Sequence, residues 1–228
     1  IVPFSTTGRI SDVKMHPADA TILFVSTVNG LYKVKDSGSI TVTKIGTGLP
    51  QRPRMVVINK NNPSIMYASV GTSGVYWSTN GGLNFSARNN GMSATLNLVK
   101  EAISLSISPA DPNDLYVCFR YGNSVAPYGV YYSHDGGANW YAPTTPDENN
   151  LASSLYFWLG TYIGHTNSAA IAVHPTNRDI AITYNVCEQP IKTINGGSTW
   201  RYSSSGYSGG RVGDSGCVSP IGWDPGNS

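Results

Sequence analysis

The sequence predicts an all-β fold built from a repeated four-stranded antiparallel unit. Two sets of repeats support this prediction. Three short stretches are variants of one another, and each joins two runs of strand-forming residues: Ser78–Phe85, Ser133–Trp140 and Thr193–Trp200. Five segments alternate apolar and variable residues before a turn: Val13–Pro17, Val56–Lys60, Leu105–Pro109, Ile171–Pro175 and Ile221–Pro225. An apolar second strand follows each of the first four, so the chain repeats one strand pattern several times.

The chemistry of the three variant stretches suits the hairpin turn between the third and fourth strands of each unit. Each stretch carries an acidic or amide side chain that can accept hydrogen bonds from the turn: Asn80, Asp135 and Asn195. The paired glycines that follow allow backbone conformations with positive φ. Each stretch closes with an aromatic residue that is expected to pack beneath the turn, between neighbouring sheets: Phe85, Trp140 and Trp200.

A degenerate fourth copy of this turn has Asp36 and Gly38 at the acidic and glycine positions, with Thr41 where the aromatic residue is expected. Four-stranded units at this spacing predict the blades of a β-propeller. We expect one continuous domain over residues 1–228. Its blades are expected at about 9–50, 54–95, 101–145 and 168–205, with a further blade starting at 216–228.

The turn pattern Ser-x-Asp-x-Gly-x-x-Trp resembles the Asp box, or BNR repeat, of sialidase-type propellers. The segment Ser108–Tyr116 is similar to repeats of xyloglucanase-like and sortilin-like propellers. The resemblance covers nearly the whole chain, and it is specific for architecture rather than activity. It implies that ligands bind on the face opposite the Asp boxes. Strand order places the loops between second and third strands, and the linkers between blades, on that face.

The two ends of the sequence suggest incomplete blades. Ile1–Ser5 reads like the last strand of a preceding blade, and the chain stops just after the first strand of a following one. Since exposed sheet edges are unfavourable, we expect a segment of a larger propeller or closure by a partner chain. Alternatively, the end strands join into a thin blade of their own.

Composition favours a secreted, cell-surface or virion-surface β protein. Charged residues are scarce, and the net charge of +2 provides no basic field for nucleic acid. No apolar stretch is long enough to span a membrane. No metal is expected, because closely spaced Cys or His ligands do not occur. No cofactor is expected, because the sequence shows no phosphate loop and no nucleotide-binding fingerprint. Cys118 is expected as a buried free thiol, whereas Cys187 and Cys217 are placed to form a disulfide in an oxidising compartment.

Two elaborate loops on the expected binding face carry aromatic and basic side chains in polar, flexible backbone. Thr144–Asn167 and Tyr202–Gly216 contain the candidate ligand-binding residues Tyr156, Trp158, Tyr162, Tyr207 and Arg211. Such side chains suit stacking on sugar rings or contact with a protein partner. Arg120 and Tyr121 are further candidates from a shorter loop. The alternative is that the apolar loop residues only cover the blades and that Arg120 and Tyr121 are simple rim residues.

Hydrolysis of a glycosidic bond would require two carboxylates roughly 5 to 9.5 Å apart. Glu188 and Asp214 are the best candidates on the expected face, with Asp12 third, although all three also fit ordinary loop carboxylates. The segment Arg52–Met55 comes nearest to the arginine motif of sialidases but does not match it. The segment Thr27–Gly30 lacks the acid that xyloglucanase-like enzymes carry at this turn. Two hypotheses remain. The protein is either a glycan-recognising propeller, alone or as part of a glycoside hydrolase, or a non-catalytic interaction module of a receptor, cell surface or virion.

Overall fold

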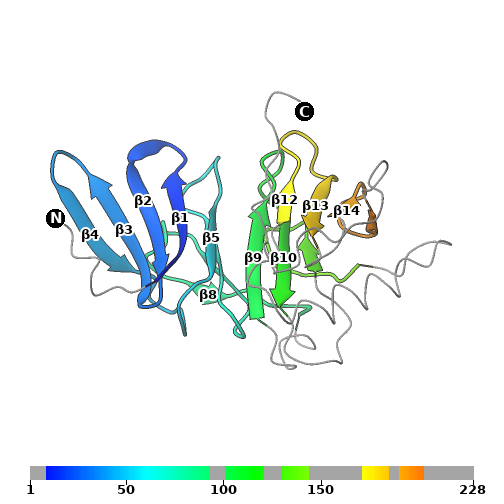
Figure 1. Cartoon of the computed structure of the whole chain (residues 1–228), viewed down its shortest axis with the longest axis horizontal. Coiled ribbons are helices and arrows are strands. Elements are labelled where there is room, and N and C mark those ends of the chain that lie inside the picture. Colours follow the sequence, from blue (N-terminus) through cyan, green and yellow to red (C-terminus); the bar gives the residue numbers. More distant parts are fainter. Residues whose placement is uncertain (1–8, 93–100, 121–129, 144–170, 185–189, 203–228) are drawn as a thin grey trace, which may run out of the picture.

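The computed structural model describes residues 9–92, 101–120, 130–143, 171–184 and 190–202. In these ranges every regular element is a β-strand, and the strands form four antiparallel sheets that lie side by side (Figure 1). Within each sheet the strands pair in chain order. Each sheet is therefore an up-and-down meander.

The sheets comprise the following strands. The first contains β1 (Ile10–His16), β2 (Asp19–Thr27), β3 (Gly30–Asp36) and β4 (Ile40–Ile45). The second contains β5 (Met55–Ile58), β6 (Met66–Ser69), β7 (Val75–Ser78) and β8 (Ser86–Ala87). The third contains β9 (Glu101–Ile107), β10 (Leu115–Arg120) and β11 (Val130–Ser133), and the fourth contains β12 (Ile171–Val173), β13 (Ala181–Tyr184), β14 (Pro190–Thr193) and β15 (Arg201–Tyr202).

The third sheet is extended by one further backbone pair. Tyr132 donates an N–H hydrogen bond to the Tyr141 carbonyl at 3.0 Å, and Tyr141 returns one at 2.8 Å. Tyr141 therefore occupies the fourth-strand position of this sheet.

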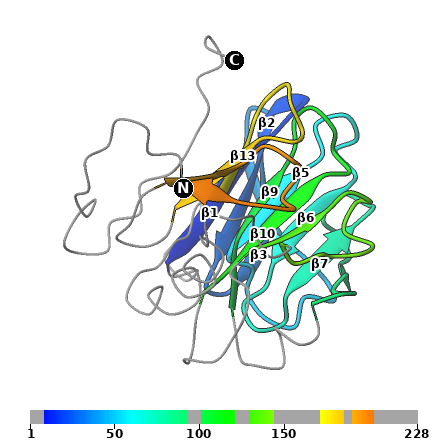
Figure 2. The same ribbon diagram turned by 90° about the vertical axis from the view of Figure 1, so that its right-hand side faces the viewer.

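The first strands of the four sheets form the inner side of the array. β1 contacts β5, β5 contacts β9, and β9 contacts β12 (Figures 1 and 2). The contact between β1 and β5 includes a hydrogen bond to a side chain: the Asp12 carboxylate accepts the Val56 N–H at 2.8 Å. Neighbouring sheets are thus joined at their inner strands.

The core consists of three clusters of buried side chains, one between each pair of neighbouring sheets. Phe85 lies in the cluster between the first and second sheets, Trp140 in the next, and Trp200 in the last. All three are buried. The aromatic residue that closes each turn therefore packs back against the preceding sheet, as its place in the repeat suggests.

The stretches 78–85, 133–140 and 193–200, called the Gly-Gly turns below, share one hydrogen-bond network. In the third sheet the Ser133 hydroxyl donates to Asp135 Oδ1 at 2.8 Å and accepts the Gly137 N–H at 2.9 Å. Asp135 Oδ1 also accepts the Asn139 N–H at 2.9 Å. The same bonds recur in the other two turns with Asn80 and Asn195 in place of the acid.

The turns between first and second strands also repeat. His16 Nδ1 accepts the N–H of Ala18 at 3.2 Å, and His174 Nδ1 accepts the N–H of Thr176 at 3.2 Å. Asn59 and Ser108 accept equivalent bonds at the same positions. These side chains cap turns, as the sequence repeat indicated for the two histidines.

The sequence predicts that the linkers between blades lie on the face opposite the Gly-Gly turns, but two linkers also contact these turns. Thr47 donates its N–H to Leu83 at 2.9 Å and accepts the Phe85 N–H at 2.8 Å, and Asn90 accepts the Trp140 N–H at 2.9 Å. Each of these two linkers therefore runs against the closing end of the next Gly-Gly turn. The physical reason is that the closing aromatic packs on the preceding sheet, where the linker leaving that sheet is the backbone available to pair with it.

Candidate functional site

Most of the side chains predicted for ligand binding, catalysis or a disulfide lie outside the described residues. These are Tyr121, Tyr156, Trp158, Tyr162, Tyr207, Arg211, Glu188, Asp214, Cys187 and Cys217. The backbone of Arg120 ends β10, where it pairs with Glu101. Their roles stay predictions.

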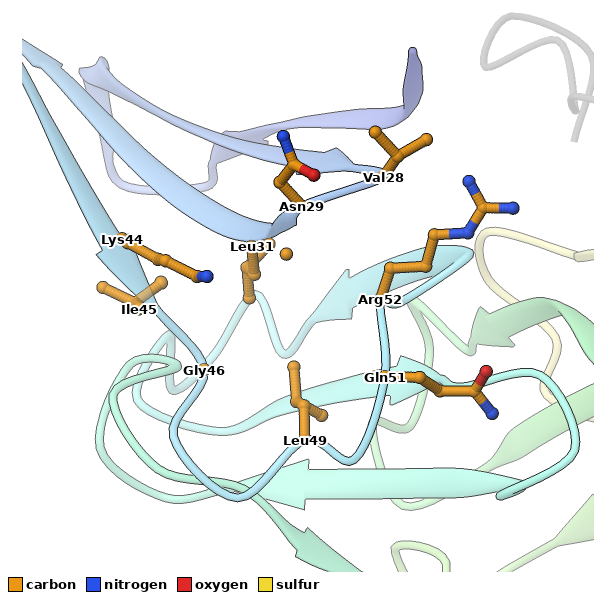
Figure 3. Close-up of a pocket in the computed structure, with 10 residues that line it drawn as sticks. Val28, Asn29, Leu31, Lys44, Ile45, Gly46, Leu49, Gln51 and Arg52 are labelled. Atoms are coloured by element: carbon orange, nitrogen blue, oxygen red, sulfur yellow. The ribbon is translucent and has the colours of Figure 1, made fainter. Parts of the chain in front are cut away.

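A pocket of about 210 Å³ opens between the first and second sheets, beside the loop that joins β2 to β3 (Figure 3). Three segments supply its lining: Val28–Leu31, Lys44–Gly46 and the linker residues Leu49, Gln51 and Arg52. By strand order this is the face that the sequence assigned to ligand binding. It is the candidate site that the described residues form.

The floor of the pocket is part of the core. Leu31 and Ile45 are directly opposite each other on β3 and β4, and both are buried in the cluster between the first two sheets. Gly46 follows with a φ of 88°, which turns the chain out of β4, and the Leu49 N–H returns to its carbonyl at 3.2 Å. Leu49 thus forms an apolar wall beside the floor.

The rim of the pocket is polar. The Gln51 side-chain amide donates to the Val70 carbonyl at 3.0 Å and to the Ser73 hydroxyl at 3.2 Å, which ties the linker to the β6–β7 loop. Lys44 and Arg52 bring two positive charges, and neither forms an ion pair with any carboxylate in the described ranges. The lining contains no acidic residue, so the pocket suits anionic or hydroxyl-bearing groups.

Two carboxylates at the same end of the inner strands are held by structural contacts. Asp12, whose side chain is 11% exposed, accepts the Val56 N–H and lies 3.4 Å from Lys14 Nζ. Glu101 pairs with Arg54 at 2.9 Å, which joins the third sheet to the second. Asp12, the third candidate acid, therefore has a clear role in sheet packing.

A second charged cluster joins the third and fourth sheets beside the Gly-Gly turns. The Asp114 side chain is fully buried, with His134 Nδ1 at 2.7 Å and Arg178 Nη2 at 2.8 Å from its Oδ1. Burial raises the pKa of Asp114, although His134 and Arg178 act in the opposite direction. The buried carboxylate and its two partners therefore join the third blade to the fourth.

The described residues provide no group of three His, Cys, Asp or Glu side chains that could hold a metal ion. Cys118 is a buried free thiol, and burial raises its pKa to about 12, which leaves it unreactive. In these same ranges no helix is long and apolar enough to cross a membrane.

Comparison with solved structures places the fold. An ancestral GH74 enzyme matches with a TM-score of 0.64 at 16% identity, over 88% of this chain and 24% of that chain. YCF48 from Cyanidioschyzon merolae matches with a TM-score of 0.57 at 15% identity, over 91% of this chain and 59% of that chain. YCF48 bound to D1 peptide gives 0.51 at 14% identity, over 87% of this chain and 54% of that chain.

These likenesses confirm the predicted all-β propeller fold with four-stranded antiparallel blades. The chain spans about a quarter of the GH74 enzyme and less than two thirds of either YCF48 chain. No protein-family profile and no curated protein matches it.

The sequence did not reveal the pocket, because its lining comes from three short segments with no common motif. Part of the pocket's basic rim was nevertheless visible in the sequence. Lys44, near the end of β4, and Arg52, in the following linker, flank Gly46 and Gly48 in a stretch without acidic residues. Only the folded chain shows that both side chains border one cavity.

Proposed function

We propose that the protein is an Asp-box propeller that recognises glycan on the face of its β2–β3 loop, outside the cell or on a cell or virion surface. The pocket beside the β2–β3 loop carries this proposal, because cationic and amide side chains border it on the face that the sequence assigned to ligand binding. The aromatic-rich loops at 144–167 and 202–216 and the fold shared with GH74 enzymes add support.

The described blades serve binding rather than bond cleavage in this proposal. Hydrolysis needs two carboxylates that are free to act as acid and as base or nucleophile. Asp12 and Glu101 are both engaged with neighbouring strands. In this proposal any hydrolytic activity of the chain is assigned to the predicted acids Glu188 and Asp214.

A non-catalytic protein-interaction module is the second candidate, and one observation favours it. The outer face of the first sheet exposes Val13 by 49% and Met15 by 62%. The equivalent residue to Val13 in the third sheet, Leu105, is 1% exposed against the second sheet. A surface built like an interior interface suits contact with another blade or another protein.

Glycan retention by the purified protein on a carbohydrate array tests the first candidate. Tyr162→Ala and Tyr207→Ala are expected to lower retention strongly, because each removes a stacking surface. Leu83→Ala, an exposed apolar residue on a Gly-Gly turn, is the matched control and should leave retention unchanged. Absence of retention for every glycan would contradict the proposal, and retention that is unaffected by both tyrosine changes would exclude Tyr162 and Tyr207 from it.

Hydrolysis is tested separately. If the protein cleaves a retained glycan, Glu188→Gln is expected to abolish cleavage while leaving retention intact. Full residual activity in that variant would exclude Glu188 as a catalytic acid or base.

A further inference from the structure

We infer that the free edge of β4 is a docking site for an acidic, extended segment of a partner protein, which adds to the first sheet as a fifth strand. The inference goes beyond the proposed glycan recognition and does not depend on it. Figure 1 shows β4 at the outer margin of the first sheet. Within the described ranges its backbone pairs with β3 alone, so the other edge of the strand is open.

β4 is longer than the outer strands of the other sheets. It has six residues, whereas β8 and β15 have two each and Tyr141 alone holds this position in the third sheet. All six residues pair with β3 without a register shift, and the strand contains neither proline nor glycine. A long, regular edge presents unpaired N–H and C=O groups, which makes it a template for strand addition.

The strand register identifies the backbone groups that point away from β3. A two-residue loop joins β2 to β3, so Thr27 and Gly30 form its closing hydrogen-bonded pair. Hydrogen-bonded and non-hydrogen-bonded pairs alternate along an antiparallel ladder, and successive residues of a strand bond to opposite sides. The outward N–H and C=O groups of β4 therefore belong to Ile40, Val42 and Lys44. In the described ranges these groups form no backbone hydrogen bond to another segment.

One end of this edge is already covered. Gly46, directly after β4, donates its N–H to the Gly82 carbonyl at 2.9 Å, where the second sheet's Gly-Gly turn packs on the first sheet. Ile45 lies beside this turn and is 8% exposed, whereas Ile40 at the other end of β4 is 56% exposed. The open part of the edge is therefore 40–44.

The charge beside the edge favours an acidic partner. The hairpin residues 30–46 contain three lysines and one aspartate, a net charge of +2 that equals the net charge of the whole chain. Lys33 and Lys35 are directly opposite Thr43 and Thr41, so these four side chains share one face of the sheet. Neither lysine forms an ion pair with a carboxylate of the described ranges. Because the threonines are short, the flexible lysine side chains can reach over them toward an added strand.

The two faces of the added strand meet different surroundings. On the face of the lysines an acidic side chain gains two cations. The Asp19 carboxylate, which Lys35 also attracts, already accepts two hydrogen bonds from Thr21. On the opposite face the added strand lies beside Ile40 and Val42, which favour apolar side chains. A segment with alternating acidic and apolar residues fits both faces, whereas a second copy of β4 would bring like charges together.

The test uses the full chain and a labelled synthetic heptapeptide of alternating Val and Glu, with binding followed by fluorescence anisotropy. Saturable binding is expected. The same peptide with Lys in place of Glu should bind at least about tenfold more weakly, because it brings like charges to the edge. Methylation of the Val backbone nitrogens should abolish binding, since in antiparallel addition these N–H groups face β4. Methylation of the Glu nitrogens, which face away from β4, is the matched control.

Substitutions in the protein test the same contact from the other side. Val42→Pro removes an outward N–H and should lower affinity about tenfold or more, while the bonds to β3 stay in place. Lys33→Gln and Lys35→Gln should each weaken binding about two- to fivefold, the range of an exposed ion pair. Lys60→Gln, an exposed lysine in the β5–β6 turn, is the matched control. Circular dichroism of each variant checks that the fold is intact.

Absence of saturable binding overturns the inference, and so does equal binding of the acidic and basic peptides. Binding that survives methylation of the Val nitrogens shows that strand addition is wrong, and this peptide control decides the question even if Val42→Pro fails to fold. If sedimentation shows a dimer of the chain that Val42→Pro abolishes, the edge pairs with a second copy instead, and the inference is wrong. Glycan retention is a separate readout, so its failure leaves the docking edge untouched.

Discussion

The hairpin between β3 and β4 and the Gly-Gly turn of the third sheet begin with similar residues but differ in how they are held. In the first, Asp36 Oδ1 accepts the Gly38 N–H at 3.2 Å, and Thr41 stands exposed at the aromatic position. In the second, Asp135 belongs to a network that ends in Trp140, which is 2% exposed. The acid and glycines suffice to make a turn, whereas the aromatic residue and the linker beneath it join one blade to the next.

The largest difference is expected from removing the closing side chain. Trp140→Ala should cost about 3–5 kcal/mol of unfolding free energy, because it empties a core site and leaves the Arg88 carbonyl without the indole N–H now at 2.8 Å. Thr41→Ala, at the equivalent place in the first sheet, should change stability by less than about 0.5 kcal/mol. Urea unfolding monitored by circular dichroism measures both. Equal costs would show that the first hairpin is also packed on a neighbour.

The next comparison uses equivalent positions on first strands. Leu105→Ala is expected to cost about 2–5 kcal/mol, since Leu105 is buried between the second and third sheets. Val13→Ala should cost less than about 1 kcal/mol, because Val13 is half exposed in the first sheet. The same unfolding measurement applies. A cost for Val13→Ala that approaches that of Leu105→Ala would mean that another blade or chain covers the outer face of the first sheet.

A third pair separates backbone strain from close packing. Gly91 and Gly38 have nearly the same φ, 91° and 92°, but a Cβ at Gly91 would run into the Trp140 carbonyl, whereas Gly38 has open space around it. Gly38→Ala should therefore cost only the strain of a positive φ, about 1 kcal/mol. Gly91→Ala should cost at least about 1 kcal/mol more. The melting temperature of each variant relative to the unchanged protein measures the two costs. Identical shifts would argue against the close approach of Gly91 to the Trp140 carbonyl.

The smallest effect is expected from Asp135→Asn, which copies the Asn80 and Asn195 turns. Partial burial raises the pKa of Asp135, but hydrogen bonds from Asn139, Ser133 and Ala138 outweigh it and hold the pKa below its ordinary value. The carboxylate therefore stabilises the fold above the unfolded-state pKa near 3.8, and this contribution is lost as pH falls through the lower folded-state value. We expect a change below about 1 kcal/mol at pH 7 and a weaker loss of stability in acid for the variant. Stability curves between pH 2 and pH 7 test this, and identical acid slopes for both proteins would contradict it.

Much of the fold could be predicted from the sequence because its repeats are local. The spacing of Ser133, Asp135, Gly137 and Trp140 is set by one turn, so a short pattern contains the information for it. The first-strand segments likewise show their apolar alternation directly. The propeller follows from repetition of these units.

The candidate site could not be predicted in the same way. Its residues come from the β2–β3 loop, the end of β4 and the following linker, which no periodicity connects. The sequence instead drew attention to the long aromatic loops and to Glu188 and Asp214, which lie outside the described residues. The structural role of Asp12 could not be predicted either, because its hydrogen-bond partner Val56 is on the neighbouring sheet.

The sequence by itself determined the all-β class, the repeated blade, and the identity of the turn, capping and aromatic residues, because each depends on conformations and spacings within a few residues. The tertiary structure decided how those parts meet. It joined the linkers to the Gly-Gly turns, buried Asp114 between two blades, and brought Lys44 and Arg52 to one pocket. These contacts depend on the packing of one sheet against the next, which sets which distant side chains become neighbours and which charges find partners.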